Sequence, residues 1–388
     1  MALQVIRRDL HAHPEVAFCE VRTAEVVARE LVALGIETHR GLAGTGVVGV
    51  LRAGRSERAI GLRADMDALS MNEANGFAHC SVFEGRMHAC GHDGHTTMLL
   101  GAARLLAASR NFDGTVYLVF QPAEEGGGGA RAMIEDGLFE RFPMEAIYGM
   151  HNWPGLPAGC FAVHAGPVMA GTDRFDIRIQ GVGGHAAMPH LAIDSVYAGA
   201  ALMQAVQSVV SRSLDPFDAA VVSITRFHAG DAYNVLPDQA ELSGTLRSFS
   251  ESVRQKALTR LTELCAGLSE AFGVKIDFSA RADSYPPTLN TAAQAAQCLQ
   301  AAAAVVGHER IRTNERPSMG AEDFACYLQH KPGAYIWIGN DPADGEHGSR
   351  AGLHNPAYDF NDNILPVGAA YWVELVRHIL GQGAQCDG

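Results

Sequence analysis

The densest group of chemically reactive side chains is the run His88-Ala-Cys-Gly-His-Asp-Gly-His95. Its two glycines permit a tight loop that turns Cys90 and His92 toward one point, just before a helix predicted at Thr96–Ala108. A thiol beside a helix N-terminus has a lowered pKa, which suits a metal ligand. A single cysteine or histidine is more often a buried core residue. Four such residues in eight favour a metal site, with Cys90 and His92 as ligands and the two outer histidines beside them.

Further acidic and imidazole side chains follow the strands that the sequence predicts nearby. They are Asp65 and Asp67 after Ala59–Ala64, Glu124 and Glu125 after Thr115–Phe120, and His151 after Ala146–Met150. Each of these residues alone is more often part of a capped turn. In an open parallel sheet, however, ligands bind at the carboxyl ends of the strands, so we expect the set to meet at one edge.

The pair Glu124-Glu125 can divide two tasks, because one carboxylate binds metal while its neighbour acts as a general base on the attacking water. Adjacent acids otherwise form a solvated turn, but these follow an apolar strand and precede four glycines. His354, in Gly-Leu-His-Asn-Pro, adds a third imidazole, although alone it would be an ordinary loop residue. One thiolate, three imidazoles and one carboxylate are what two adjacent zinc-like ions need if one ligand bridges them.

Apolar strands that alternate with helices are expected to position these residues. Besides the elements above, the sequence predicts strands at Gly46–Leu51 and Ala334–Ile338 and helices at Thr23–Leu34, Thr291–Val306, Ala321–Leu328 and Leu365–Leu380. Continuous apolar strands separated by helices predict an α/β domain with a mixed, largely parallel sheet covered on both faces. We place this domain at residues 1–171 and 286–388.

Residues 172–285 have a different pattern, and we expect them to form an inserted domain. The predicted elements are a strand at Arg174–Gln180, a helix capped by Asp194 and ending near Ser211, strands at Ala219–Phe227 and Gln239–Ser248, a helix at Glu251–Phe272 and a strand at Val274–Ala282. This β-α-β-β-α-β order is that of an α+β ferredoxin-like unit.

Length and composition limit the classes of function. With 388 residues the chain exceeds one ordinary core, and 47% hydrophobic with 19% charged residues is typical of a folded globular protein. The net charge of −13 disfavours nucleic acid and anionic membranes as partners. The sequence has no apolar run of bilayer length and no recognisable secretory leader, and its eight scattered cysteines are expected to be reduced thiols. We therefore expect a cytoplasmic protein.

The chain resembles the M20 metallopeptidases, specifically their amidohydrolase branch. The motifs that carry the resemblance span the whole chain in one order. They are Leu10-His-Ala-His-Pro-Glu15, Arg63-Ala-Asp-Met-Asp-Ala-Leu69, the Cys90 run, Gln121-Pro-Ala-Glu-Glu125, Gly149-Met-His-Asn-Trp153, Gly183-Gly-His-Ala-Ala-Met-Pro-His190, Met319-Gly-Ala-Glu-Asp-Phe324 and His354-Asn-Pro. The resemblance implies a zinc-exopeptidase-like catalytic domain that binds two divalent ions, which are zinc, manganese, cobalt or nickel.

Carried over position by position, the resemblance assigns roles to individual residues. The implied metal ligands are Cys90, His92, Glu125, His151 and His354. Glu124 matches the general base, and Asp67 matches the aspartate that orients a ligand histidine. In the inserted domain, which dimerises in this family, His185 would stabilise the oxyanion from its own or the partner subunit. Asn234 and Arg247 would hold the substrate carboxylate.

These residues predict metal-dependent hydrolysis of the amide bond of small N-acyl amino acids by a homodimer or homotetramer that forms through the inserted domain. Two enzymatic alternatives are a dipeptidase or aminopeptidase and a deacetylase of an N-acetyl diamino acid. A peptidase would need an acidic residue to hold a free α-amino group, and none can be assigned. A non-catalytic metal-binding dimer is the alternative outside enzymes, and the presence of Glu124 beside all five implied ligands argues against it.

Overall fold

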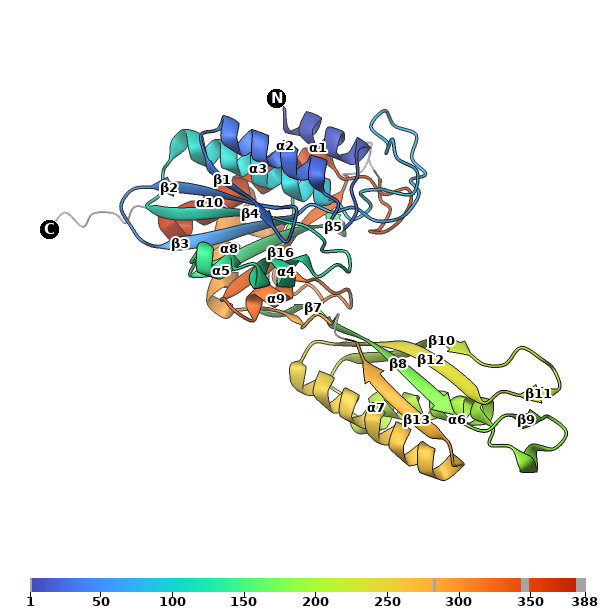
Figure 1. Ribbon diagram of the computed structural model, residues 1–388. Coiled ribbons are helices and arrows are strands. Elements are labelled where there is room, and N and C mark those ends of the chain that lie inside the picture. The colour runs from blue at the N-terminus through green and yellow to red at the C-terminus, as the bar shows by residue number, and fades with distance from the viewer. Residues whose placement is uncertain (1, 282–283, 343–348, 382–388) are drawn as a thin grey trace. The chain divides into compact units, whose positions relative to one another are not determined.

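The chain divides into two compact units in the computed structural model, which describes residues 2–281, 284–342 and 349–381 (Figure 1). Cys386 and the predicted strand end Ala282 lie outside the described residues. The larger unit comprises Met1–Val168, Leu289–Arg316 and Asp323–Gly388, and the smaller comprises Met169–Thr288 and Pro317–Glu322. The segment Pro317–Glu322 lies with the smaller unit because the Ala170 N–H donates to the carbonyls of Ser318 and Gly320.

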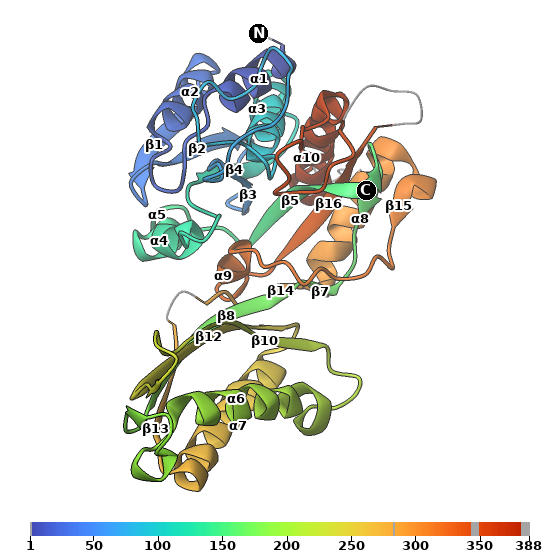
Figure 2. The ribbon, with the colours of Figure 1, turned by 90° about the vertical axis from the view of Figure 1, so that its right-hand side faces the viewer.

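The larger unit contains an eight-stranded sheet, visible edge-on in Figure 1 and turned in Figure 2. Its strands are β1 (Glu37–Leu42), β2 (Gly46–Ala53), β3 (Ala59–Asp65), β4 (Gly114–Gln121), β5 (Ala146–Pro157), β6 (Phe161–Ala162), β15 (Ile311–Arg312) and β16 (Gly333–Asp341). They lie in the order β1-β2-β4-β3-β5-β16-β6-β15. The pairs β3–β4, β3–β5, β5–β16 and β6–β15 are parallel, and the others are antiparallel. The predicted mixed, largely parallel sheet is confirmed.

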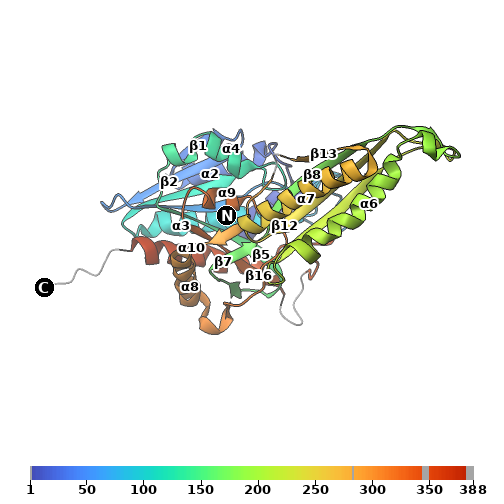
Figure 3. The same ribbon diagram turned by 90° about the horizontal axis from the view of Figure 1, so that it is seen from below.

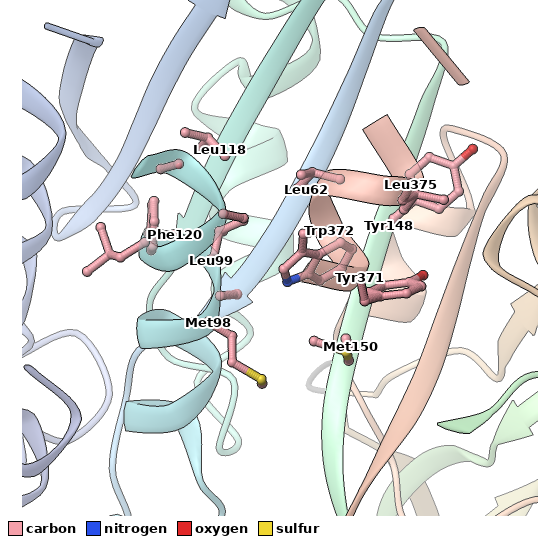
Figure 4. Close-up of a cluster of buried hydrophobic side chains, with 14 of the residues drawn as sticks. Leu62, Met98, Leu99, Leu118, Phe120, Tyr148, Met150, Tyr371, Trp372 and Leu375 are labelled. Atoms are coloured by element: carbon pink, nitrogen blue, oxygen red, sulfur yellow. The ribbon is translucent and has the colours of Figure 1, made fainter. Parts of the chain in front are cut away.

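Helices cover both faces of this sheet. They are α1 (Leu3–Ala12), α2 (Val21–Ala33), α3 (His92–Ser109), α4 (Gly129–Glu135), α5 (Leu138–Arg141), α8 (Ala292–Val306), α9 (Phe324–Leu328) and α10 (Leu365–Leu380). Figure 1 shows α1, α2 and α3 on one face and α4, α5 and α9 on the other. Because both faces are covered, every residue of β3 and β4 is buried, which explains their continuous apolar sequences. Leu62 of β3 and Leu118 of β4 belong to one core with Leu99 of α3 and Trp372 of α10 (Figure 4).

The smaller unit has the predicted ferredoxin-like order. Its main elements are β8 (Gly171–Gln180), α6 (Ser195–Ser208), β10 (Ala220–His228), β12 (Gln239–Ser248), α7 (Glu251–Phe272) and β13 (Lys275–Ala280). The antiparallel sheet has the order β10-β12-β8-β13, and α6 and α7 pack against each other beside it (Figure 3). The Asp194 carboxylate caps α6 as predicted, since it accepts the N–H groups of Val196 and Tyr197. A short strand pair, β9 (Gly184–His185) and β11 (Val235–Leu236), extends from this unit.

Two element boundaries differ from the prediction and affect the chemistry. The helix α3 begins at His92 rather than at Thr96, because Gly91 in a left-handed conformation (φ +91°) starts it and accepts the N–H groups of Gly94 and His95. The strand β5 continues to Pro157, so His151 lies inside a strand and not after one. Among the helices of the described residues, none is long and apolar enough to cross a membrane.

Candidate metal centre

Cys90, His92 and His151 meet at the carboxyl end of the central strands. Cys90 precedes α3, His92 is its first residue, and their donor atoms lie with that of His151 within 4.8 Å of one another. The Cys90 Sγ atom is 3.4 Å from His151 Nε2. The other ring nitrogen of His151, Nδ1, is 2.6 Å from the carbonyl of Asn152, which fixes the tautomer and directs the Nε2 lone pair toward the thiol.

A second group of donor atoms shares Cys90 with the first. Cys90, Glu125 and His354 also have donor atoms within 4.8 Å of one another. His354 Nε2 lies 3.3 Å from Glu125 Oε1, and His92 Nε2 lies 3.9 Å from the same oxygen. The backbone N–H of His354 donates to the carbonyl of Ala89, so the late loop that carries this histidine is tied to the residue next to Cys90.

These donor atoms fit two divalent cations. An ion with bonds of about 2.0–2.3 Å holds donor atoms about 3–4 Å apart. The Cys90–His151 donor pair of the first group lies 3.4 Å apart, and the Glu125–His354 pair of the second lies 3.3 Å apart. Cys90 belongs to both groups, so its thiolate would be available to both ions. His92 Nε2 is buried and has no hydrogen-bond partner among the described residues, as expected of a nitrogen that coordinates metal. Thiolate with imidazole and carboxylate is a donor set suited to zinc and neighbouring transition metals.

Asp67 connects the predicted ligand His92 to Glu124, the predicted general base. Its Oδ1 atom lies 3.3 Å from His92 Nδ1 and accepts the backbone N–H of Glu124, while its Oδ2 atom accepts that of Glu125. The Glu124 side chain is buried, and its Oε1 atom lies 3.4 Å from the backbone nitrogen of Asp323. Donor atoms of Glu124, Glu125 and His92 lie within 4.8 Å of one another, which places the buried Glu124 carboxylate directly beside two of the predicted ligands.

Asp65, His88 and His95 are not among the predicted ligands, and their contacts indicate other roles. His95 Nδ1 lies 2.6 Å from Asp65 Oδ1, and His95 Nε2 accepts the backbone N–H of Asn152 at 2.9 Å. Although Asp65 and His95 have donor atoms near His92, these atoms are engaged with each other and with further partners. His88 is buried, and burial lowers its pKa to about 4, so it is neutral.

A buried guanidinium supports one flank of the centre. The Arg63 Nε atom donates to Gln121 Oε1 at 2.8 Å, Nη1 donates to Asp65 at 2.6 Å, and Nη2 donates to Asp323 at 3.0 Å. All four side chains are fully buried or nearly so. This network joins β3 and β4 to the start of α9, close to both His95 and Glu124.

Asn152 supports the other flank, and its place in the sequence did not reveal this. Its Nδ2 atom donates to the carbonyl of Cys90 at 2.6 Å, and its Oδ1 atom accepts the hydroxyl hydrogen of Tyr358 at 2.7 Å. Alternation along β5 points Asn152 away from the face that His151 uses. The Asn152 side chain is fully buried, so its polar atoms need the partners that Cys90 and Tyr358 provide.

The pKa of Cys90 differs in direction from the prediction. Burial and the neighbouring carboxylates of Glu125 and Glu124 raise the pKa of the Cys90 thiol well above its usual value, whereas a lowered pKa was expected beside a helix N-terminus. A divalent cation held by the thiol would reverse this balance. Burial lowers the pKa of His151 well below its usual range, so this imidazole is neutral and free to coordinate.

The three predicted substrate-binding residues lie in the smaller unit, in two separate places. His185 on β9 is exposed, and the Ala186 N–H beside it donates to the carbonyl of Asn234, so His185 and Asn234 are neighbours. Arg247 is half-buried near the last residues of β12, opposite Thr172 of β8. The strand β11, which pairs with β9, ends just before Gln239, the first residue of β12. Arg247 lies eight residues after Gln239, which corresponds to about 27 Å along the strand at about 3.4 Å per residue. The structure does not bring Arg247 together with His185 within one chain.

Comparison with known proteins places the chain in a family. The model of Peptidase family M20/M25/M40 matches residues 61–378. A hippurate hydrolase of Campylobacter jejuni is 41% identical over 97% of this chain and 96% of its own length, and an N-acetylcysteine deacetylase of Bacillus subtilis is 38% identical with the same coverage. A solved structure from Bacillus subtilis, described as a dinuclear metal-binding peptidase of the M20 family, has a TM-score of 0.86 at 36% identity and covers 97% of both chains. The chain therefore belongs to peptidase family M20/M25/M40, as predicted, and is a hydrolase of amide bonds.

Proposed function

We propose that this protein hydrolyses the amide bond of N-acyl amino acids with two divalent metal ions. The observation that carries the proposal is the convergence of donor atoms, with Cys90 shared by two groups and Glu124 beside them. The proposed ligands are Cys90, His92, Glu125, His151 and His354. The relatives named for hydrolysis of hippurate and deacetylation of N-acetylcysteine support this substrate class.

The residues of the chain have distinct tasks in the proposed reaction. Bound metal ions would lower the pKa of a water molecule toward neutrality and polarise the scissile carbonyl. Glu124 accepts a proton from the attacking water and transfers it to the leaving amine as the C–N bond breaks, so that a carboxylic acid and a free amino acid are released. Asp67 contacts both the backbone N–H of Glu124 and the ring of His92, which fixes the position of the general base relative to the proposed ligand. Burial of Glu124 excludes bulk water from the proton transfer.

The substrate-binding roles require two subunits. We assign stabilisation of the oxyanion to His185 and binding of the substrate carboxylate to Asn234 and Arg247. Arginine suits this task because a guanidinium binds a carboxylate through two parallel hydrogen bonds. One small substrate cannot reach both ends of β12, so His185 and Arg247 at one active site belong to different subunits. A homodimer or homotetramer through the smaller unit is supported by the exposed edge strand β10 and by exposed apolar residues, among them Tyr197 and Val221.

The cysteine side chains support a proposal for the kind of metal and for the cellular compartment. Cys90 favours zinc-like ions, and the mixed ligand set also suits manganese, cobalt or nickel. The seven cysteines among the described residues are all free, which supports a reducing compartment and hence the cytoplasm.

The test of this function is a pair of adjacent substitutions. Glu124→Gln should lower kcat by about 10²–10⁴-fold on benzoyl-, acetyl- and indole-acetyl-amino acids, while two metal ions per chain still bind. Glu125→Gln is the matched control, since it should lose metal as measured by elemental analysis after dialysis. Near-normal turnover of Glu124→Gln would remove that residue from its role. If the wild-type protein loaded with zinc, manganese, cobalt or nickel cleaves no member of the series, the proposed substrate class is wrong.

A further inference from the structure

The segment that carries Glu124 and Glu125 is held by buried carboxylates through its backbone. The Ala123 N–H donates to Glu20 at 2.9 Å, the next two N–H groups donate to Asp67, and the Ala130 N–H donates to Asp323 at 2.9 Å. Four consecutive glycines, residues 126–129, make this segment costly to order, because glycine loses more conformational freedom than other residues. Two hydrogen bonds within the segment, from the Gly126 N–H to the Glu124 carbonyl and from the Gly129 N–H to the Ala123 carbonyl, provide part of its order, and the buried carboxylates provide the rest.

Ala123 is the least favourable backbone position in this segment. It is fully buried and has φ +55°, a left-handed conformation that costs a non-glycine residue about 1–2 kcal/mol. Such a conformation persists only where neighbouring groups impose it. Because Ala123 immediately precedes Glu124, its backbone angles determine the direction in which the Glu124 and Glu125 side chains leave the chain.

Glu20 is the buried carboxylate that contacts Ala123, and no step of the proposed reaction uses it. Its side chain lies at the start of α2, and the residue is fully buried. One oxygen accepts the N–H groups of Ala123 and Phe18, both at 2.9 Å, and the other accepts the Thr45 hydroxyl at 2.6 Å. Both oxygens are therefore fixed, so the Ala123 N–H meets an acceptor whose position is determined independently of the glycine-rich segment.

We propose that Glu20 is a positioning residue for the general base. Its carboxylate holds Ala123 in the left-handed conformation and thereby directs Glu124 toward the water and Glu125 toward the metal. The inference rests on the proposed function for the role of Glu124. A merely structural role would give a different result, because loss of Glu20 would then lower stability without disturbing turnover of the folded protein.

Three variants and one control distinguish a positioning role of Glu20 from a merely structural one. Glu20→Ala should lower kcat by about 10–100-fold at saturating metal and change KM by less than about threefold, since the proposed carboxylate-binding residues lie in the smaller unit. Glu20→Gln should retain most of the activity, because its amide oxygen can accept the Ala123 N–H and its amide nitrogen can donate to Thr45. Ala123→Gly in the Glu20→Ala background should restore part of kcat, since glycine adopts φ +55° without the steric cost.

The control is Glu15→Ala, which removes a carboxylate that also accepts two backbone N–H groups, those of Arg22 and Thr23 at the start of α2. This variant should lose stability but keep kcat. Hydrogen exchange of peptides over residues 122–130 gives a readout independent of activity, and it should accelerate in Glu20→Ala and not in Glu15→Ala. Equal kcat in the two alanine variants, or unchanged exchange in Glu20→Ala, would overturn the proposal. If the wild-type protein hydrolyses no substrate, the proposed function fails, while the exchange comparison still tests whether Glu20 orders the segment.

Discussion

Gly91 is a residue at which the backbone of the candidate metal centre tolerates no side chain. It lies between Cys90 and His92 with φ +91°, a conformation that favours glycine. A β-carbon there would lie 2.5 Å from Tyr358 Oη and closer still to Asn152 Nδ2. Neither side chain can move away freely, because both are fully buried and hydrogen-bonded to each other. Asn152 also donates a hydrogen bond to the Cys90 carbonyl. We therefore predict that Gly91→Ala disrupts stability and metal binding together.

The magnitude follows from two separate costs. The left-handed backbone costs an alanine about 1–2 kcal/mol. Displacement of Asn152 breaks its hydrogen bonds to Cys90 and Tyr358, and each buried group left without a partner costs about 1–3 kcal/mol. The sum is about 3–8 kcal/mol. At about 2 °C per kcal/mol for a unit of this size, the transition of the larger unit should fall by about 6–16 °C.

The matched control is Gly35→Ala, because Gly35 also has a left-handed backbone (φ +69°) but a β-carbon there would have no atom within 4 Å. Only the backbone cost applies, so this variant should lose about 2–4 °C in thermal denaturation. Elemental analysis should find two metal ions per chain in Gly35→Ala and fewer in Gly91→Ala, since movement of Cys90 removes the donor shared by both groups. Equal melting temperatures with full metal content in both variants would show that Asn152 and Tyr358 do not confine the Cys90 loop.

Two further predictions concern a buried ion pair and the assembly. Although burial opposes protonation, Asp93 raises the pKa of His11 to about 9, so the stabilisation from this pair is complete below about pH 6.5 and is lost as the pH rises through 9. The difference in melting temperature between wild type and His11→Gln should thus shrink between pH 6 and pH 9.5, and a constant difference would contradict this assignment. The His185→Ala and Arg247→Ala variants should each be inactive, and mixing them should restore activity because one site takes His185 and Arg247 from different subunits. Mixed assemblies that exchange subunits but regain no turnover would exclude the shared site.

Elements with a regular apolar pattern could be predicted from sequence, and elements with polar contacts could not. The bounds of β12 and α7 agree with their predictions, because each presents a repeating apolar face to the core of its unit. The strand β1 was missed because it is an edge strand with a largely exposed polar sequence. The helix α1 was missed for a different reason, since two of its buried residues are Arg7 and His11, which bind carboxylates rather than apolar neighbours.

The same distinction applies to the metal centre. Its proposed ligands could be named from sequence because thiol, imidazole and carboxylate groups are chemically distinctive and stand in motifs that resemble those of the M20 family. The supporting residues are an ordinary asparagine, arginine and glutamate, whose partners lie far away in sequence, as Glu20 and Ala123 show. A buried polar group needs its hydrogen bonds satisfied, so Asn152 inside an apolar strand already requires polar partners on the face opposite His151. Those partners prove to be the Cys90 carbonyl and Tyr358, which means that β5 contributes to the candidate centre from both of its faces: one carries the proposed ligand His151, and the other holds the loop that carries Cys90.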